Sequence, residues 1–224
     1  MSRPVFLFAA GYGKRLAPLT DTTPKPLTPV GNSTLIERLI NQLHTAGYRD
    51  LIINVCHLAN QITTQLGDGS AYGMRIRYID ESPTPKETAG ALYHALTTGY
   101  LDKQQPFLAI NADIYTDFPF ATLQQQPVDW AHLVMVPNPP HHPAGDFSCI
   151  DGRIGTQSPQ HTFSGIGLYH PDGILTDYRS PRLGAHIRQQ CPSQRISGTI
   201  YQGIWHDVGT TTRLQTVRQI AANN

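Results

Sequence analysis

The first half of the chain alternates between two hydrophobic periods. Continuous apolar runs, the pattern of strands buried on both faces, occupy 5–10, 51–55 and 107–111. Apolar residues at helical spacing occupy 34–47, 59–66 and 88–101, and apolar and polar residues alternate over 74–78. This βαβαβ order predicts a Rossmann-like, doubly wound α/β sheet whose ligand site lies beyond the carboxyl ends of the strands.

The predicted helix over 34–47 carries its own boundary signals. Thr34 and Glu37 have the spacing of a capping box, and Gly47 is typical of a helix end. We therefore expect an amphipathic helix between them. Its buried stripe would consist of Leu35, Ile36, Leu39, Ile40 and Leu43.

The second half has shorter strand patterns between loops rich in proline and glycine. Asp151-Gly152 is typical of a hairpin turn, and the apolar positions of 210–222 predict a final amphipathic helix. We expect a mixed α+β subregion here, and one domain over 1–224 in all. The strand candidates are 130–136, 147–150, 165–169 and 196–208.

Composition narrows the class of protein. The 224 residues are 39% hydrophobic and carry a formal net charge of +1, which excludes a disordered chain and disfavours a nucleic-acid binder. No apolar run reaches the roughly 18 residues that a membrane helix needs. Three widely spaced cysteines fit neither a disulfide framework nor a zinc site, and the first apolar run is too short for a signal peptide. We therefore expect a cytoplasmic protein without nucleic-acid or membrane partners.

A short glycine loop follows the first predicted strand. Gly11 and Gly13 allow a close approach of the backbone, and Lys14 and Arg15 follow at once. The dinucleotide fingerprint fails because its third glycine would fall at Leu16, and Walker A fails because one residue separates the two glycines. A nest of N–H groups beside two cations, suited to a triphosphate, remains as the prediction. A plain strand-to-helix turn is the alternative.

Two prolines bracket Lys25. Pro24 and Pro26 are expected to fix the local backbone in an extended form and to exclude helix, so the lysine would be presented from a stiff segment. A lysine positioned in this way suits a phosphate group. An ordinary exposed lysine is the alternative if the glycine loop does not bind phosphate.

Two aspartates follow apolar stretches. Asp113 comes just after the predicted strand 107–111, and Asp207 precedes the last predicted helix. Magnesium prefers hard oxygen ligands and is usually held by one or two carboxylates together with substrate phosphates. We predict that Asp113 and Asp207 bind Mg²⁺. The alternatives are a turn residue at Asp113 and a contribution to the helix start at Asp207.

Five segments together resemble the sugar-1-phosphate nucleotidyltransferase family, in the same order and at similar spacing over nearly the whole chain. The resemblance implies the nucleotide-diphospho-sugar transferase fold, which is GT-A-like. It also implies an enzyme that joins a nucleoside triphosphate and a sugar 1-phosphate. A nucleotide-binding half, 1–125, would precede a sugar-binding half, 126–224, that carries the second metal aspartate. The segments are Ala9-Ala-Gly-Tyr-Gly-Lys-Arg-Leu-Ala-Pro-Leu-Thr20, Pro24-Lys-Pro-Leu27, Glu87-Thr-Ala-Gly-Ala91, Asn111-Ala-Asp113 and Trp205-His-Asp-Val-Gly-Thr210.

The resemblance implies roles for individual residues. Arg15, Lys25 and Asp113 would be catalytic, and Asp113 and Asp207 would hold Mg²⁺. The sugar would be bound by Asn111, Gly145, Asp146, Gly165 and Arg182. The nucleotide would be bound by Ala10, Gly11, Gly13, Lys14, Arg15, Lys25, Glu87 and Gly90.

Within this family, the compact length and the segments 141–147 and 162–166 most resemble uridylyltransferases that act on N-acetylmuramate 1-phosphate in peptidoglycan recycling. UTP and that sugar phosphate are therefore the expected substrates. The alternatives are GTP with mannose 1-phosphate, dTTP with glucose 1-phosphate, and a regulator that binds a nucleotide sugar without turnover. Ala112 replaces a common glycine, which would narrow the sugar-phosphate space, and Arg182 stands where relatives often have lysine.

Overall fold

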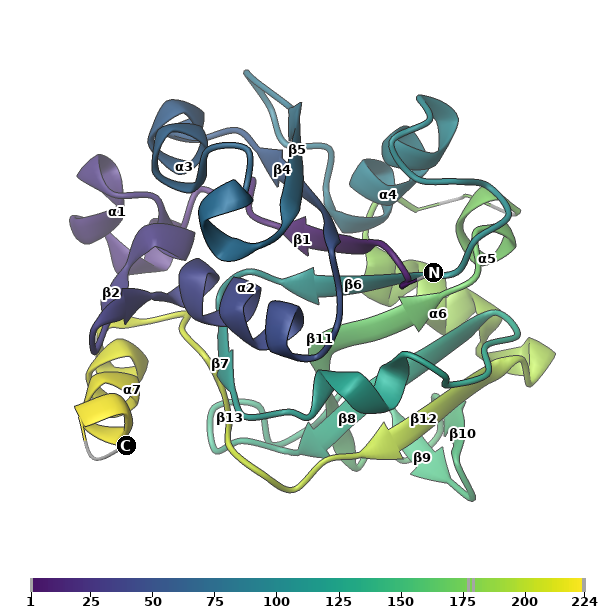
Figure 1. Cartoon of the computed structure of the whole chain (residues 1–224). Coiled ribbons are helices and arrows are strands. Elements are labelled where there is room, and N and C mark those ends of the chain that lie inside the picture. The colour runs from purple at the N-terminus through teal and green to yellow at the C-terminus, as the bar shows by residue number, and fades with distance from the viewer. Residues whose placement is uncertain (1, 177, 179, 223–224) are drawn as a thin grey trace. The chain divides into compact units, whose positions relative to one another are not determined.

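The computed structural model describes residues 2–176, 178 and 180–222 (Figure 1). They form two compact units, each built from separate stretches of the chain. The first unit comprises 2–85, 111–121 and 204–222, and the second takes 86–110 and the described residues of 122–203. These boundaries do not coincide with a division near residue 125, and the assignment of one half to the nucleotide and the other to the sugar stays a prediction.

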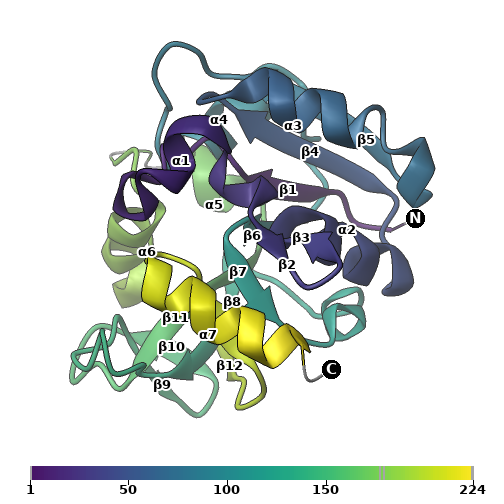
Figure 2. The ribbon, with the colours of Figure 1, turned by 90° about the vertical axis from the view of Figure 1, so that its left-hand side faces the viewer.

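The first unit contains a parallel sheet in the order β5-β4-β1. Helix α2 connects β1 to β4, and α3 connects β4 to β5 and runs along these strands (Figure 2). The βαβαβ order expected from the sequence is therefore present here. The bounds are β1 Val5–Phe8, α2 Leu35–Thr45, β4 Asp50–Val55, α3 Ala59–Leu66 and β5 Arg75–Asp80.

The start of α2 has the predicted capping box. Thr34 Oγ1 accepts from the Glu37 N–H at 3.4 Å, and the Glu37 carboxylate accepts from the Thr34 N–H at 2.9 Å. The Glu37 carboxylate also accepts from Gln65 and Tyr72, at 3.0 and 2.9 Å. The buried stripe of α2 consists of the five residues expected from its spacing: Leu35, Ile36, Leu39, Ile40 and Leu43.

Short strands and two more helices complete the first unit. β7 pairs with β13, and β2 pairs with β3, both antiparallel. Helix α7 packs beside β2 and β13. The bounds are α1 Leu19–Thr22, β2 Pro29–Val30, β3 Ser33–Thr34, β7 Ile114–Thr116, β13 Trp205–Asp207 and α7 Thr211–Ala222.

The second unit contains a mixed sheet in the order β6-β11-β8-β12-β10-β9. β12 runs parallel to β8, and the other neighbours are antiparallel. The predicted turn at Asp151-Gly152 joins β9 to β10 with positive φ at both residues, as a type I′ hairpin requires. The bounds are α4 Thr88–Thr97, β6 Phe107–Asn111, β8 Ala131–Pro137, β9 Ser148–Ile150, β10 Arg153–Gly155, β11 His161–Tyr169, α5 Asp172–Leu175, α6 Leu183–Gln190 and β12 Ile196–Ile200.

The single strand expected over 196–208 is wrong, because two strands, β12 and β13, occupy this stretch. Between them, Ile204 bonds to the end of β7 and to the residue that follows it. Its N–H donates to Asp117 Oδ1 at 2.8 Å, and its carbonyl accepts from Thr116 Oγ1 at 2.8 Å. The Asp117 N–H also donates to this carbonyl at 3.2 Å, so Ile204 is bonded to Thr116 and Asp117 and not to β8, the partner of β12.

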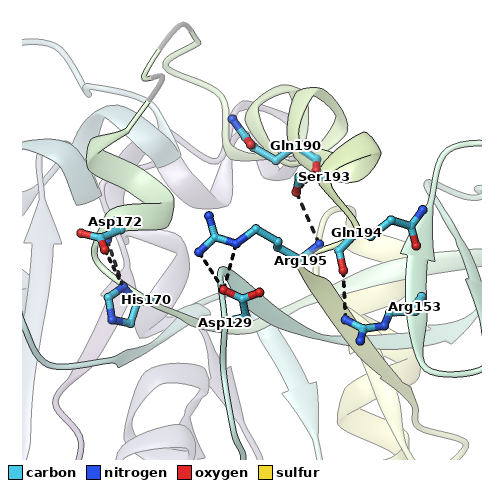
Figure 3. Close-up of polar contacts among 8 residues, drawn as sticks. All are labelled: Asp129, Arg153, His170, Asp172, Gln190, Ser193, Gln194 and Arg195. Atoms are coloured by element: carbon cyan, nitrogen blue, oxygen red, sulfur yellow. Dashed lines mark hydrogen bonds and ion pairs between the residues drawn. The ribbon is translucent and has the colours of Figure 1, made fainter.

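Polar contacts at the surface of the second unit surround the start of β12 (Figure 3). The Arg195 guanidinium donates to Asp129 Oδ1 through Nε at 2.9 Å and through Nη2 at 2.7 Å. Arg153 Nη1 donates to the Gln194 carbonyl at 3.0 Å. Both charged partners of the Asp129–Arg195 pair are about half exposed, so the pair adds little stability.

Each helix within the described parts of the chain is too short or too polar to traverse a bilayer.

Candidate active site

The glycine loop leaves β1 and turns at Gly13. Gly13 has φ 65° and ψ 21°, a left-handed conformation that glycine adopts without strain. A methyl group on its Cα would lie 2.8 Å from Thr20 Cγ2, and the Thr20 hydroxyl donates to the Gly13 carbonyl at 3.0 Å. A methyl group on Gly11 would meet nothing within 4 Å. The backbone therefore requires glycine at position 13, whereas Gly11 leaves open space beside the loop.

Two side chains that the sequence reading missed fasten this loop. The Tyr12 hydroxyl donates to the Pro83 carbonyl at 3.0 Å, across 71 residues. His57 Nε2 lies 2.8 Å from the Thr20 carbonyl oxygen. The Lys14 ammonium lies 5.5 Å from the centroid of the Tyr12 ring, within cation–π range. The contacts of Tyr12 with Pro83 and of His57 with Thr20 are long-range and have no local sequence signal.

A buried polar chain holds the entrance to the loop. The Ala9 N–H donates to Asn54 Oδ1 at 2.8 Å, and Asn54 Nδ2 donates to Glu81 Oε1 at 3.1 Å. Asn54 and Glu81 are each 4% exposed. Because the Ala9 N–H donates to a side chain and not to a neighbouring strand, β1 ends at Phe8, two residues before the apolar run does.

Lys25 lies on a single 3-10 turn, Lys25–Leu27. The extended segment expected from the two prolines is therefore wrong beyond Pro24, whose φ of −64° and ψ of 140° are extended. Pro26 fits the first positions of a helical turn, where its missing N–H costs no hydrogen bond. The Lys25 ammonium, 11% exposed, forms an ion pair with Asp113. The structure thus places one predicted cation against one predicted metal ligand.

The pairing of β7 with β13 brings the two predicted metal ligands to neighbouring positions. Asp207 lies opposite Ile114, the residue after Asp113, and the Val208 N–H donates to the Asp113 carbonyl at 2.9 Å. Arg213 Nη1 lies 2.5 Å from both oxygens of the Asp207 carboxylate. Each aspartate is therefore held by a cation, and Arg213 is a charged residue that the sequence reading missed.

A buried apolar cluster fixes the backbone of these segments. Arg15, Asp207 and Arg213 are each followed in the chain by one of its members, so the packing of the cluster positions these charged side chains. Sequence periodicity does not reveal such a cluster, because it joins residues from several segments. Its buried members are Leu16, Val30, Leu35, Tyr115, Val208, Leu214 and Val217.

The Asp113 and Asp207 carboxylates fit a magnesium ion by their chemistry. They are hard oxygen donors, and their side chains are 32% and 26% exposed. Within the described part of the chain, no three His, Cys, Asp or Glu side chains gather at one metal-ligating position. Two carboxylates suffice for Mg²⁺, which completes its shell with phosphate oxygens and water.

The other predicted residues of the first unit differ in exposure. Ala10 is 4% exposed, whereas the side chains of Lys14 and Arg15 are exposed. Asn111 is half-buried at the end of β6. Ala112 is fully buried, and its N–H donates to the Phe8 carbonyl at 3.1 Å. The two exposed cations are thus available to an anion in solvent.

In the second unit, Glu87 and Arg182 lie together at the starts of α4 and α6. Arg182 Nε is 3.8 Å from Glu87 Oε1, and the two side chains are 75% and 53% exposed. The Gly90 N–H donates to the Pro181 carbonyl at 3.1 Å, and a methyl group there would come within 3.2 Å of the Tyr178 hydroxyl. The structure therefore brings the predicted residues Glu87, Gly90 and Arg182 close together in this unit.

Asp146 lies elsewhere in the second unit, among other polar partners. Its carboxylate accepts from the Phe163 N–H at 3.0 Å. His142 Nε2 and Arg188 Nη2 lie 3.2 and 3.5 Å from Asp146 Oδ1. These contacts fix the orientation of a carboxylate that remains 27% exposed.

Gly145 and Gly165 both adopt positive φ, 67° and 79°. A methyl group on Gly145 would lie 2.6 Å from Asn138 Oδ1. Gly165 falls at the irregularity in β11 between Phe163 and Ile166. Backbone geometry therefore accounts for glycine at both positions, and any contact with a sugar stays a prediction.

Two titratable groups close to these segments are perturbed by burial. Burial raises the pKa of the Cys56 thiol, and burial lowers the pKa of His206. Cys56 also lines a cavity of about 450 Å³ with Asp80 and Ser82, at the carboxyl ends of β4 and β5. Burial therefore favours the thiol form of Cys56 and the neutral form of His206.

Comparison with known proteins shows the family to which the chain belongs. The family model described as nucleotidyl transferase matches residues 5–157. The chain belongs to the nucleotidyl transferase family. The resemblance to sugar-1-phosphate nucleotidyltransferases seen in the motifs is thereby confirmed.

Two curated relatives of this nucleotidyltransferase differ in their named substrates. The N-acetylmuramate alpha-1-phosphate uridylyltransferase of Neisseria meningitidis serogroup B is 40% identical over 227 residues, which cover 96% of both chains. The mannose-1-phosphate guanylyltransferase catalytic subunit beta of Drosophila melanogaster is 35% identical over 200 residues, covering 87% of this chain and 46% of that protein. The chain therefore matches nearly the whole length of the first relative and about half the length of the second.

A solved structure confirms the predicted fold class. A candidate glucose-1-phosphate thymidylyltransferase from Bacillus anthracis superimposes with a TM-score of 0.85, covering 100% of this chain and 96% of the other. The sequence identity is 18%, so the similarity shows the fold alone. The nucleotidyltransferase has the expected mixed α/β architecture.

Proposed function

We propose that this nucleotidyltransferase joins UTP and N-acetyl-α-muramate 1-phosphate to give UDP-N-acetylmuramate and pyrophosphate, with Mg²⁺ as cofactor. One observation carries the proposal: 40% identity over 96% of both chains to the Neisseria uridylyltransferase that acts on this sugar phosphate. The cations and carboxylates of the first unit supply the chemistry. The proposed setting is peptidoglycan recycling in the cytoplasm, where the three free thiols would stay reduced.

The reaction needs no general base. The second pKa of a phosphate monoester is about 6, so the sugar phosphate is mostly dianionic at neutral pH. One of its oxygens attacks the α-phosphorus of UTP and forms a new P–O bond. The bond between the α-phosphorus and the α–β bridging oxygen breaks, and its electron pair leaves with pyrophosphate. No proton is transferred in this step, so the absence of a histidine from the proposed catalytic set is no obstacle.

The difficulty is electrostatic, because two anions must meet and charge accumulates on the leaving pyrophosphate. We assign Gly13, Lys14 and Arg15 to the triphosphate, which the exposed cations and backbone N–H groups of the loop would bind. Lys25 would contact the phosphates near the reacting phosphorus. Preorganised donors of this kind stabilise the transition state more than the ground state.

Asp113 and Asp207 would hold the magnesium ion. When bound, Mg²⁺ would neutralise phosphate charge and help to orient the triphosphate. The protein's own part is to hold both carboxylates in place, and their ion pairs with Lys25 and Arg213 do this.

The remaining predicted residues would bind the base and the sugar. Ala10, Gly11, Glu87 and Gly90 are proposed for the nucleotide. The lactyl carboxylate of muramate needs a cation, and Arg182 is the proposed partner, because its side chain is 75% exposed. Asn111, Gly145, Asp146 and Gly165 are proposed for the rest of the sugar.

GTP with mannose 1-phosphate is a second candidate pair, which the 35% identity to the Drosophila guanylyltransferase favours. The two pairs share every proposed step and differ only in base and sugar. A regulator without turnover is disfavoured, because Arg15, Lys25, Asp113 and Asp207 are all present.

Mg²⁺-dependent release of pyrophosphate from UTP and N-acetylmuramate 1-phosphate tests the proposal, with the mass of the nucleotide sugar as a second readout. We expect both products from the unmodified protein and neither from Asp113→Ala. Tight binding of UDP-N-acetylmuramate without any turnover would instead favour the regulator.

A further inference from the structure

Two arginines from distant parts of the sequence converge at Gly209. A methyl group on the Gly209 Cα would collide with Arg213 Nη2 and lie 3.1 Å from Arg15 Nη2. Arg15 comes from the glycine loop and Arg213 from the first turn of α7. Both guanidinium ends therefore approach the small space that glycine leaves open.

Arg213 is held firmly in this position. Its Nη1 contacts both Asp207 oxygens, its Nε donates to Thr210 Oγ1 at 3.4 Å, and its side chain is 15% exposed. Arg15 is exposed and makes no ion pair with any residue that the structure describes. Arg213 is thus fixed by Asp207 and Thr210, and the exposed Arg15 guanidinium reaches the same space at Gly209.

We propose that Arg213 is a second phosphate-binding arginine, which works with Arg15 to hold the pyrophosphate end of the nucleoside triphosphate. The inference rests on the proposed function and adds a binding residue to it. Guanidinium groups bind phosphate oxygens through paired N–H donors, and two of them can share the charge of a pyrophosphate. Asp207 orients Arg213 through Nη1, and Nη2 lies beside Gly209, where Arg15 Nη2 also approaches.

Gly209 is part of the same arrangement. It does not adopt positive φ, so alanine would introduce no backbone strain there. The added methyl group would instead displace the flexible end of Arg213. Gly209→Ala therefore moves the guanidinium group while the Arg213 and Asp207 side chains both remain.

Calorimetric titration with inorganic pyrophosphate tests the proposal, first with Mg²⁺ and then with a chelator. We expect Arg213→Gln to weaken pyrophosphate binding by about tenfold or more under both conditions, as the loss of a hydrogen bond between charged groups would. Gly209→Ala should also weaken pyrophosphate binding. Arg218→Gln, which removes one positive charge further along α7, should stay within about twofold of the unmodified protein.

Several results would overturn the inference. They are an absence of pyrophosphate binding by the unmodified protein under both conditions, unchanged binding by folded Arg213→Gln, or an equal loss in Arg218→Gln. A loss in Arg213→Gln that disappears with the chelator would show that Arg213 acts only through the metal at Asp207. The titration needs neither sugar nor turnover, so Arg213-dependent binding would stand even if the proposed transfer reaction failed.

Discussion

Lys25 and Asp113 lie 88 residues apart in the sequence and form an ion pair in the first unit. The lysine side chain is 11% exposed, so it is fixed near the carboxylate rather than free in solvent. This relationship gives Lys25 two tasks in the proposed mechanism. It keeps Asp113 in place before a metal binds, and it presents a positive charge where phosphate groups would arrive.

Replacing Lys25 should therefore impair the chemical step. We expect Lys25→Ala to lower kcat by about 10² to 10³, the range found when one preorganised electrostatic donor is removed. Steady-state kinetics at saturating UTP and sugar phosphate measure the change. Lys103→Ala, at an exposed position, should leave kcat unchanged. A near-normal kcat for Lys25→Ala would remove Lys25 from the mechanism.

Arg15 should be sensitive even to a conservative change. A single ammonium cannot reproduce the forked contact of a guanidinium group with phosphate, so we expect Arg15→Lys to lower kcat/KM for UTP by about tenfold. The KM for the sugar phosphate should change little. If the sugar-phosphate KM alone rises, Arg15 contacts the other substrate.

The two aspartates should control metal binding independently of turnover. Asp113→Asn and Asp207→Asn should each weaken Mn²⁺ binding by at least about tenfold in the presence of UTP, because even groups that only support a metal ligand contribute that much. Electron paramagnetic resonance of free Mn²⁺ provides the measurement. Asp102→Asn, at an exposed position, serves as the control. Equal Mn²⁺ affinity in all three variants would rule out the assigned metal site.

The capping box of α2 predicts a pH dependence of stability. Burial alone would raise the pKa of Glu37, but hydrogen bonds from Gln65, Thr34 and Tyr72 outweigh it and lower the pKa from 4.5 to about 2. A folded-state pKa below the unfolded value stabilises the fold fully above about pH 4.5, and this contribution is lost as the pH falls toward 2.

Glu37→Gln should accordingly reduce the free energy of unfolding by about 1 kcal/mol at pH 7. The difference from the unmodified protein should shrink as the pH falls from about 4.5 toward 2. Urea unfolding over this pH range measures both values. A difference that is constant with pH would mean that the charge of Glu37 does not contribute.

Local sequence signals predicted the features that local chemistry decides. The Thr34–Glu37 capping box needs only a spacing of three residues, and the Asp151-Gly152 turn needs only two residues that tolerate positive φ. The glycine loop belongs to the same class, because its position after a strand and its glycines are visible in the sequence.

The features that the sequence did not predict depend on distant partners. Nothing near Arg213 in the sequence indicates that it contacts Asp207 or that it meets Arg15 beside Gly209, since the cluster that packs α7 joins several segments. The break between β12 and β13 depends on Thr116 and Asp117, almost ninety residues earlier. Long-range contacts of this kind override local pattern, and the structure is needed to find them.

Pyrophosphate release measured across a grid of nucleoside triphosphates and sugar 1-phosphates tests the central claim most directly, with Asp113→Ala as the blank. The account predicts Mg²⁺-dependent turnover that is highest for UTP with N-acetylmuramate 1-phosphate. A maximum at another pair, such as GTP with mannose 1-phosphate, would contradict the proposed substrates and keep the transfer chemistry. An absence of turnover for every pair would contradict the proposed reaction itself.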